Sequence, residues 1–211
     1  MCCVLIRIGF LRKLDLWSRS SIIRTGLRIS LQEPFTRHPT GTTQKKETIT
    51  RMSSPDVEDN RGKRAFATLG EYLERDGWHP QRLGEDTRYR TGFLGENGQM
   101  ACYAQVLAEL EQFLFYVLAP VKAPEDTRSA VAEFITRANY GLRIGNFEMD
   151  FADGEVRYKS SLDFEDAMLT PELIKGGIYP AVRTMDRYLP GLMRVIYGGQ
   201  SALEAILEIE Q

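Results

Sequence analysis

The clearest alternation of hydrophobic and polar residues in the chain lies between residues 146 and 159. Apolar residues occupy every second position on both sides of the dipeptide Asp153-Gly154. A period of two indicates strands with one buried face. Asp-Gly is typical of a two-residue hairpin turn, so the pattern predicts an antiparallel hairpin. The apolar positions are Phe147, Met149, Phe151, Val156 and Tyr158.

A turn at Asp153-Gly154 fixes every cross-strand pair by counting. The predicted pairs are Phe151 with Val156 and Met149 with Tyr158 on the buried face, and Asp150 with Arg157 and Glu148 with Lys159 on the exposed face. Each favourable pair contributes roughly 0.2–1 kcal/mol. The charged residues are therefore interpreted as a solvated sheet face and not as catalytic carboxylates.

The strand before this turn changes face near Gly145. Leu142 and Ile144 have the opposite parity to Phe147. A bulge or bend at Gly145 explains the change. The alternative is a glycine that lets a ligand approach the backbone.

Four further elements precede this hairpin. The first is a helix with a buried stripe that ends at Asp76-Gly77. A hairpin over 89–107 turns at Asn97-Gly98, and a strand over 113–118 follows. Because 99–118 is too long for one strand, we expect a turn within 108–112 with Glu109 and Glu111 pointing outward. Pro120 ends the third strand. Pro124 opens the second helix. The two helical stripes are Phe66, Leu69, Tyr72 and Leu73, and Val131, Phe134, Ile135 and Ala138.

The longest helical pattern begins at Thr170-Pro171, which are typical N-cap and first helical residues. Pro180 and Pro190 are expected to kink or break it, because each lacks a backbone N–H and clashes with the preceding turn. Gly198-Gly199 ends it, and a capping box from Ser201 to Glu204 opens a last short helix. The expected apolar stripe is Leu173, Ile174, Ile178, Val182, Met185, Leu189, Leu192 and Ile196.

The predicted order is α-β-β-β-α-β-β-α followed by a short helix. Strands that are neighbours in sequence and joined by hairpins favour an α+β fold, in which helices cover an antiparallel sheet of about five strands.

Charge divides the chain unevenly. Residues 1–51 contain ten Lys or Arg and three Asp or Glu, a net of +7, while residues 52–211 contain 17 and 26, a net of −9. Such an acidic domain repels nucleic-acid phosphates on average. The charges therefore disfavour a nucleic-acid partner.

Residues 1–62 are expected to form a disordered extension, and residues 63–211 the folded domain. Charged residues interrupt every apolar run near the N-terminus, so we expect neither a membrane span nor a secretory signal. A transit peptide or a weak amphipathic segment are alternatives. Another is that translation naturally starts near Met52 and the residues before it are upstream sequence.

No group of residues predicts catalysis, a cofactor or a metal. Cys102 lies in a strand-like run and is expected to be a buried thiol. His79 is the one histidine after residue 38, and we expect it at the surface. The acidic loop 163–166 lacks the glycine-punctuated spacing of a calcium site. The three tyrosines Tyr179, Tyr188 and Tyr197 suit core and rim packing, with a partner-facing stripe as the alternative.

Four short motifs resemble the YbjN family, whose members are described as bacterial sensory transduction regulators. They are Ala138-Asn139-Tyr140, Gly145-Asn146-Phe147, Asp186-Arg187-Tyr188-Leu189-Pro190 and Gly198-Gly199. The resemblance covers about residues 66–206. It implies the fold that these domains share with type III secretion chaperones, and it supplies no catalytic position.

The sequence contains no motif that predicts catalysis, a cofactor or a metal. Together with this resemblance, that favours a non-catalytic protein-binding or regulatory module of a chaperone-like kind. The similar chaperones form dimers and hold extended client segments, so a protein partner and a homodimer are expected. Reduced cysteine is compatible with the cytoplasm. The alternative is a small-molecule sensor, or an enzyme whose scattered site one sequence does not reveal.

Overall fold

The computed structural model describes residues 55–84 and 87–211. The expectations for residues 1–54 lie outside this range. In chain order the elements are α2 (Pro55–Arg75), β1 (Gln81–Arg82), β2 (Arg88–Leu94), β3 (Gln99–Leu107), η1 (Ala108–Leu110), β4 (Gln112–Lys122), η2 (Glu125–Thr127), α3 (Arg128–Gly141), β5 (Asn146–Met149), β6 (Glu155–Asp163), α4 (Pro171–Tyr197) and α5 (Ala202–Glu210).

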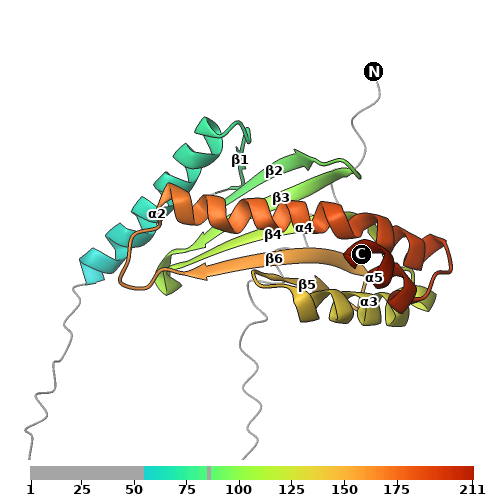
Figure 1. Cartoon of the computed structure of the whole chain (residues 1–211). Helices are drawn as coiled ribbons and strands as arrows, with labels where there is room; N and C mark the ends of the chain where they lie inside the picture. The colour runs from blue at the N-terminus through green and yellow to red at the C-terminus, as the bar shows by residue number, and fades with distance from the viewer. Residues whose placement is uncertain (1–54, 85–86) are drawn as a thin grey trace, which may run out of the picture. The chain divides into compact units, whose positions relative to one another are not determined.

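The strands form one antiparallel sheet in the order β1-β2-β3-β4-β6-β5 (Figure 1). The predicted α+β class and element order are confirmed. The sheet has six strands instead of about five, because β1 contributes two residues, too few to show a hydrophobic period. At the other edge, β5 is also short.

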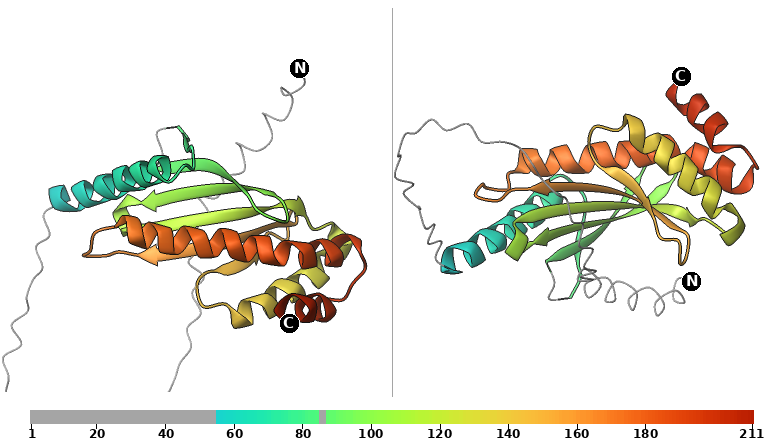
Figure 2. Two further views of the ribbon diagram at one scale, coloured as in Figure 1. Left: turned by 45° about the horizontal axis from the view of Figure 1, so that its top comes forward. Right: turned by 90° about the horizontal axis from the view of Figure 1, so that it is seen from below.

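Helices pack on the sheet and on one another. The long helix α4 lies along β4 and β6, α2 contacts β3, and α3 and α5 gather with α4 at the end of the sheet near β5 (Figures 1 and 2). The fully buried side chains between these layers include Leu69, Phe113, Phe115, Phe134, Tyr158, Ile178 and Met185. The predicted stripe of α3 is buried in full.

α2 begins earlier than the sequence suggests. Its first residue is Pro55, which falls inside the expected 1–62 extension, so the predicted boundary at residue 62 cuts through a helix. The first turns are polar and carry no apolar stripe, which is why periodicity detected only the part from Phe66 onward.

α4 is one continuous helix of 27 residues, so of the two predicted effects of Pro180 and Pro190, a kink or a break, the break does not occur. Its N-cap is Thr170 as expected, with the hydroxyl accepting from the N–H of Leu173 at 3.4 Å. Leu173 itself is exposed, so it does not belong to the buried stripe as predicted. Packing of the remaining stripe against the sheet holds the helix together across both prolines.

A side chain replaces the helical hydrogen bond that Pro190 cannot donate. Pro190 has no N–H to offer the carbonyl of Asp186 four residues earlier. The side-chain amide of Asn97, at the tip of the β2–β3 hairpin, donates to that carbonyl at 3.0 Å. The hairpin therefore supplies the hydrogen bond that the helix lacks.

The register of the β5–β6 hairpin differs from the prediction by two residues. Met149 pairs with Val156 instead of Tyr158, and Glu148 pairs with Arg157. A shift of two keeps each side chain on its predicted face but changes its partner. The loop spans 151–154, because Asp150 closes the ladder through its N–H to the carbonyl of Glu155 at 2.9 Å. Phe151, predicted to be buried, is 59% exposed in this loop.

The bend at Gly145 is confirmed. Gly145 has φ +73°, and a Cβ there would lie 2.5 Å from the carbonyl oxygen of Lys159. The strand starts only after it, at Asn146, so Leu142 and Ile144 precede β5 instead of forming part of it. The hydroxyl of Tyr158 donates to the carbonyl of Ile144.

Two expectations around β4 are wrong. The strand continues past Pro120 to Lys122, with an irregularity in its pairing to β6 after Leu118. Proline is tolerated there because a bulge frees the N–H position. The turn within 108–112 is confirmed, but Glu111 does not point outward: it is 5% exposed, with φ +49°.

Candidate functional site

The helices cover one face of the sheet. Phe66 of α2 stacks on Tyr89 with ring centroids 4.7 Å apart, and Gly177 of α4 lies over Phe113. Within the described ranges we find no helix packed against the opposite face, which we call the open face. It consists of Arg88, Arg90, Gly92, Leu94, Ala101, Tyr103, Gln105, Leu107, Leu114, Tyr116, Leu118, Asn146, Glu148, Arg157, Lys159 and Ser161.

Two tyrosines form the centre of the open face. Tyr103 and Tyr116 are cross-strand partners, and each is 8% exposed. The Arg157 guanidinium lies 4.7 Å from the centroid of the Tyr116 ring. Burial raises the pKa of both phenols, so they stay protonated at neutral pH. With their rings buried, these tyrosines offer no platform on which a nucleic-acid base could stack.

Glu148 organises the charged side of this face. Its carboxylate accepts from Arg157 at 2.7 and 2.9 Å and pairs with Lys159. Burial pushes the pKa of Glu148 upward, but the bonds from Lys159 and Arg157 outweigh it and hold the pKa below its ordinary value. The prediction of a charged, outward sheet face is correct. One carboxylate bridges both cations, instead of pairing with Lys159 alone.

Apolar side chains also lie on the open face. Leu107, Leu114 and Leu118 are half-buried, and Leu94 at the β2 edge is 80% exposed. These leucines lie on the same face as the charged group of Glu148, Arg157 and Lys159.

The residues that sequence reasoning considered for chemistry are not brought together. His79 is exposed and follows the buried Trp78, while Cys102 is fully buried, and burial raises the pKa of its thiol to about 12. Across residues 55–84 and 87–211, no three His, Cys, Asp or Glu residues form a group that could hold a metal ion.

The acidic loop after β6 makes structural contacts. The Asp163 carboxylate accepts from the N–H of Glu165 at 2.9 Å. The N–H of Asp166 donates to the buried Glu111 carboxylate at 3.0 Å, and Arg61 pairs with the same carboxylate. Glu111 thus connects α2, the β3–β4 turn and this loop. Sequence reasoning missed it, because no local pattern marks a carboxylate whose partners lie about fifty residues away on either side.

A second missed cluster surrounds Asp76, which ends α2. One oxygen of its carboxylate accepts from Tyr72 at 3.0 Å, from the Trp78 indole at 2.9 Å and from Tyr179 of α4 at 2.9 Å. Burial raises the pKa of Asp76, but the three donors outweigh this and lower it. Asp76 directly follows the last residue of α2, as the sequence predicts, and its carboxylate also links α2 to α4.

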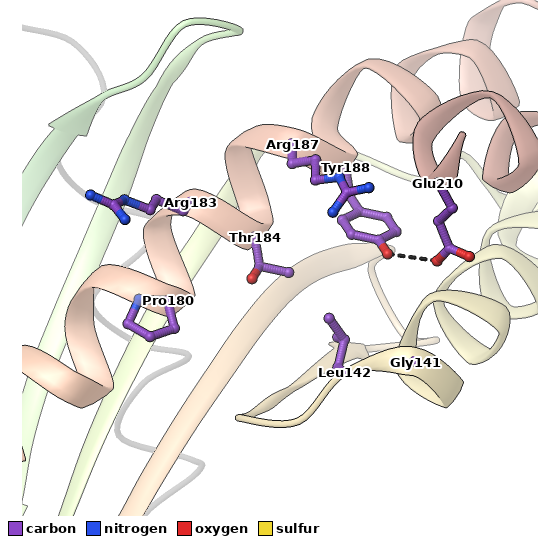
Figure 3. Close-up of a pocket in the computed structure, with 8 residues that line it drawn as sticks. All are labelled: Gly141, Leu142, Pro180, Arg183, Thr184, Arg187, Tyr188 and Glu210. Carbon is purple, nitrogen blue, oxygen red and sulfur yellow. Dashed lines mark hydrogen bonds between the residues drawn. The ribbon is translucent and has the colours of Figure 1, made fainter.

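One cavity of about 420 Å³ lies between α4, the end of α3 and the end of α5 (Figure 3). Its polar groups are engaged with neighbours: Tyr188 donates to Glu210 at 2.7 Å, and Arg187 donates to the carbonyl of Ile209 at 2.8 Å. Burial, followed by the Glu210 carboxylate, raises the pKa of Tyr188 to about 12. Arg183 points away from these groups (Figure 3). The wall residues are Gly141, Leu142, Pro180, Arg183, Thr184, Arg187, Tyr188 and Glu210.

The motifs singled out in the sequence hold the fold together. Asn139 of α3 donates to the carbonyl of Phe147 at 3.1 Å and accepts from its N–H at 2.7 Å. Asp186 of α4 accepts from the N–H groups of Glu96 and Asn97 at 3.0 and 2.9 Å. Neither motif converges on a reaction centre, so their chemistry is that of structural anchors.

No described helix combines the length and hydrophobicity that crossing a membrane requires.

The chain is similar to a protein of known structure and to a protein family. A chain in the structure titled "Crystal Structure of the ExsC-ExsE Complex" is similar, with 18% sequence identity and a TM-score of 0.44, over 61% of this chain and 93% of that one. No curated protein sequence matched. Residues 66–193 match the family described as "Putative bacterial sensory transduction regulator". Since this match spans more than half of the chain, the chain belongs to the YbjN family.

Proposed function

We propose that this chain is a non-catalytic protein-binding module that takes a partner protein on the open face. The observation that supports the proposal is the one-sided cover of the sheet. Helices lie over one face, while the other carries half-buried leucines that no described helix covers. A partner surface would complete the burial of these leucines.

The open face combines apolar and charged side chains. Removing apolar surface from water contributes roughly 25 cal/mol per Å². Leu107, Leu114 and Leu118 lie on the two central strands, while Arg157 and Lys159 lie on the neighbouring strand. An apolar centre beside fixed charges is the usual anatomy of an interface, in which the charges select and orient the partner.

A protein partner suits this face better than a nucleic acid does. Tyr103 and Tyr116 have no exposed ring face for stacking, and Glu148 already bridges Arg157 and Lys159. The −9 charge of residues 52–211 opposes phosphate binding further.

The rival is a small-molecule sensor that uses the cavity beside α4. Its volume of about 420 Å³ falls in the range of ligand pockets. However, Tyr188, Arg187 and Glu210 are bonded to protein groups, so a ligand would have to displace existing hydrogen bonds. That the chain is not an enzyme, and that it acts in the cytoplasm, stay predictions.

A matched pair of variants tests the proposal. Leu114→Asp places a charge on the open face, and Leu110→Asp places the same charge on η1, away from it. Partners are captured from native-host extract with a photo-reactive residue at the exposed Ser161, and are identified by mass spectrometry. We expect one dominant protein with the unsubstituted sequence and with Leu110→Asp, and its loss with Leu114→Asp.

Two results would contradict the proposal. One is equal capture by Leu114→Asp and Leu110→Asp, both with native circular dichroism. The other is a small molecule that co-purifies stoichiometrically and is lost on Arg187→Ala, which would promote the sensor.

A further inference from the structure

The apolar centre of the open face runs along its two middle strands, β3 and β4. Leu114 and Leu118 lie on β4, and Leu107 lies at the end of β3. Tyr116 lies between the two β4 leucines and faces Tyr103 of β3. Four residues of an antiparallel strand span about 14 Å, which equals about two and a half turns of an α-helix. The centre is therefore long enough to receive a short helix.

Cations flank this centre on both sides. On this face β2 carries Arg88 and Arg90, and β6 carries Arg157 and Lys159. The strand registers define one row across the sheet that runs from Arg90 through the two tyrosines to Lys159. The cations therefore lie one strand outward from the apolar centre, on either side of it.

The carboxylates of this face lie at its margin. Glu148 of β5 bonds to the two cations of β6, and Glu155 and Asp163 occupy the two ends of β6. In the part of the chain that the structure describes, positive charge therefore dominates the middle of the face. This dominance is greater on the β2 side, because Glu148 lies on the other side. Residues 52–211 as a whole carry −9, so the charge of this face is opposite to that of the domain.

The spacing of these features matches the width of one α-helix. Neighbouring strands lie about 4.8 Å apart, so the three spacings from β2 to β6 amount to about 14 Å. A helix with its side chains is about 10–12 Å across. A helix laid along β3 and β4 would place an apolar stripe on the leucines and its two flanks beside the cations. On the opposite face, α4 already lies along β4 and β6 (Figures 1 and 2).

We propose that the segment bound by the open face is an amphipathic α-helix of a partner protein, with acidic residues on both sides of its apolar stripe. This partner chemistry rests on the proposed function and adds to it the shape and charge of the bound segment. The cations of β2 and β6 attract the acidic flanks and fix the direction of the helix across the sheet. An extended segment, about 5 Å wide, would reach the cations of one side only.

The experiment uses the full chain and three designed peptides of about 20 residues, a length at which an isolated helix can form. The first carries a leucine stripe flanked by glutamates, and the second has lysines in place of the glutamates. The third retains the glutamates but contains a central proline, which breaks the helix. Fluorescence anisotropy measures the Kd of each peptide. We expect the acidic helix to bind at least about tenfold more tightly than the other two, and less tightly as salt rises.

A matched pair of charge reversals locates the bound helix. Arg90→Glu reverses a cation of the β2 side, and Arg183→Glu reverses an exposed cation of α4. We expect Arg90→Glu to weaken binding of the acidic helix at least about tenfold, and Arg183→Glu to leave it unchanged. The lysine peptide should bind Arg90→Glu more tightly than the unsubstituted chain, because repulsion on this flank becomes attraction. Circular dichroism of both variants verifies that the fold is retained.

Several outcomes would overturn the proposal. They are no binding of the acidic helix, equal Kd values for the acidic and lysine helices, and equal effects of Arg90→Glu and Arg183→Glu. Another is single-stranded DNA of similar length that displaces the acidic helix and loses affinity in Arg90→Glu, since the face would then select phosphates. With capture at Ser161 still dependent on Leu114, the first three outcomes leave the proposed function intact and reject only the acidic helix as its partner.

Discussion

The two long hairpins carry similar turn sequences and reach their geometry by different routes. The β2–β3 hairpin has Asn97-Gly98 and the β5–β6 hairpin has Asp153-Gly154, and both dipeptides predict two-residue turns. In the structure both turns are centred one residue earlier. Gly95 and Gly98 close the first around Glu96-Asn97, and Asp150 closes the second around a four-residue loop.

The first tip is held by a distant helix. Asp186 of α4 accepts two backbone N–H groups of this tip, and no residue of the turn has positive φ. A Cβ at Gly95 would lie 2.2 Å from that carboxylate, so the glycine makes room for the anchor.

The second tip is held by the end of the neighbouring strand β4 and by its own side chains. Gly154 has φ +73°, and its carbonyl accepts from the N–H of Ala123 at 2.8 Å. The Asp150 side chain accepts from the N–H of Ala152 at 2.8 Å, and Lys122 pairs with Asp153 at 2.7 Å. The comparison shows that a turn dipeptide marks a hairpin, while the contacts of its tip select the register.

The largest expected effect comes from Gly154→Ala. Its Cβ would lie 1.9 Å from the Ala123 carbonyl oxygen, on a backbone with positive φ. We expect a loss of about 3 kcal/mol in the free energy of unfolding, measured by urea denaturation. In the other hairpin, the Cβ of Gly98→Ala would lie 2.9 Å from the end of the Leu189 side chain and 4.0 Å from Pro120, with no backbone atom in contact, and the substitution should cost less than about 1 kcal/mol. Equal losses would contradict the different origins of the two turns.

Met149→Asp should destabilise the chain by about 2 kcal/mol more than Glu148→Ala does. Met149 packs against the helix-covered core, and Glu148 lies on the open face. Because the register shift of two keeps faces unchanged, this expectation survives the corrected pairing. Thermal and urea unfolding of both variants provide the measurement, and similar losses would mean that the faces are misassigned.

Asp186→Ala should lower the free energy of unfolding by about 1–2 kcal/mol, because it removes the acceptor of two backbone N–H groups. Asp153→Ala in the other hairpin removes a turn bond from the N–H of Glu155 and the ion pair with Lys122, and should cost less, because an ion pair with a mostly exposed lysine contributes little. A double variant with Gly95→Ala isolates the contact. The alanine should be better tolerated when the carboxylate is gone, and strict additivity would argue against the anchor.

The smallest effect concerns pH. Since the pKa of Glu148 is lower in the folded chain than its ordinary value, Glu148 stabilises the fold above that ordinary value, and the contribution disappears as pH falls through the folded pKa. Unfolding measured from neutral pH to about pH 3 should show a shallower acid loss for Glu148→Gln than for the unsubstituted chain. Identical pH profiles would show that the Arg157 and Lys159 contacts contribute nothing measurable.

The sequence alone determined the element types and their order. The period of two around 146–159, the stripe of α3 and the capping box at Ser201 are local signals, and the structure confirms each of them. Local patterns suffice here because burial of one face and satisfaction of a helix end depend on residues close in sequence. The same signals led to the predicted α+β fold, while the family resemblance came from four short motifs.

The tertiary structure decided the strand registers, the continuity of α4 and the contacts of the carboxylates that no local sequence pattern marks. Asn97 bonds to the carbonyl that Pro190 leaves without a helical partner, and Glu111 meets Arg61 from α2. These partners are tens of residues apart in sequence, and no local pattern encodes them. The face of the sheet that the described helices leave open likewise depends on where these helices pack, which is settled only when the whole chain competes for the same buried surface.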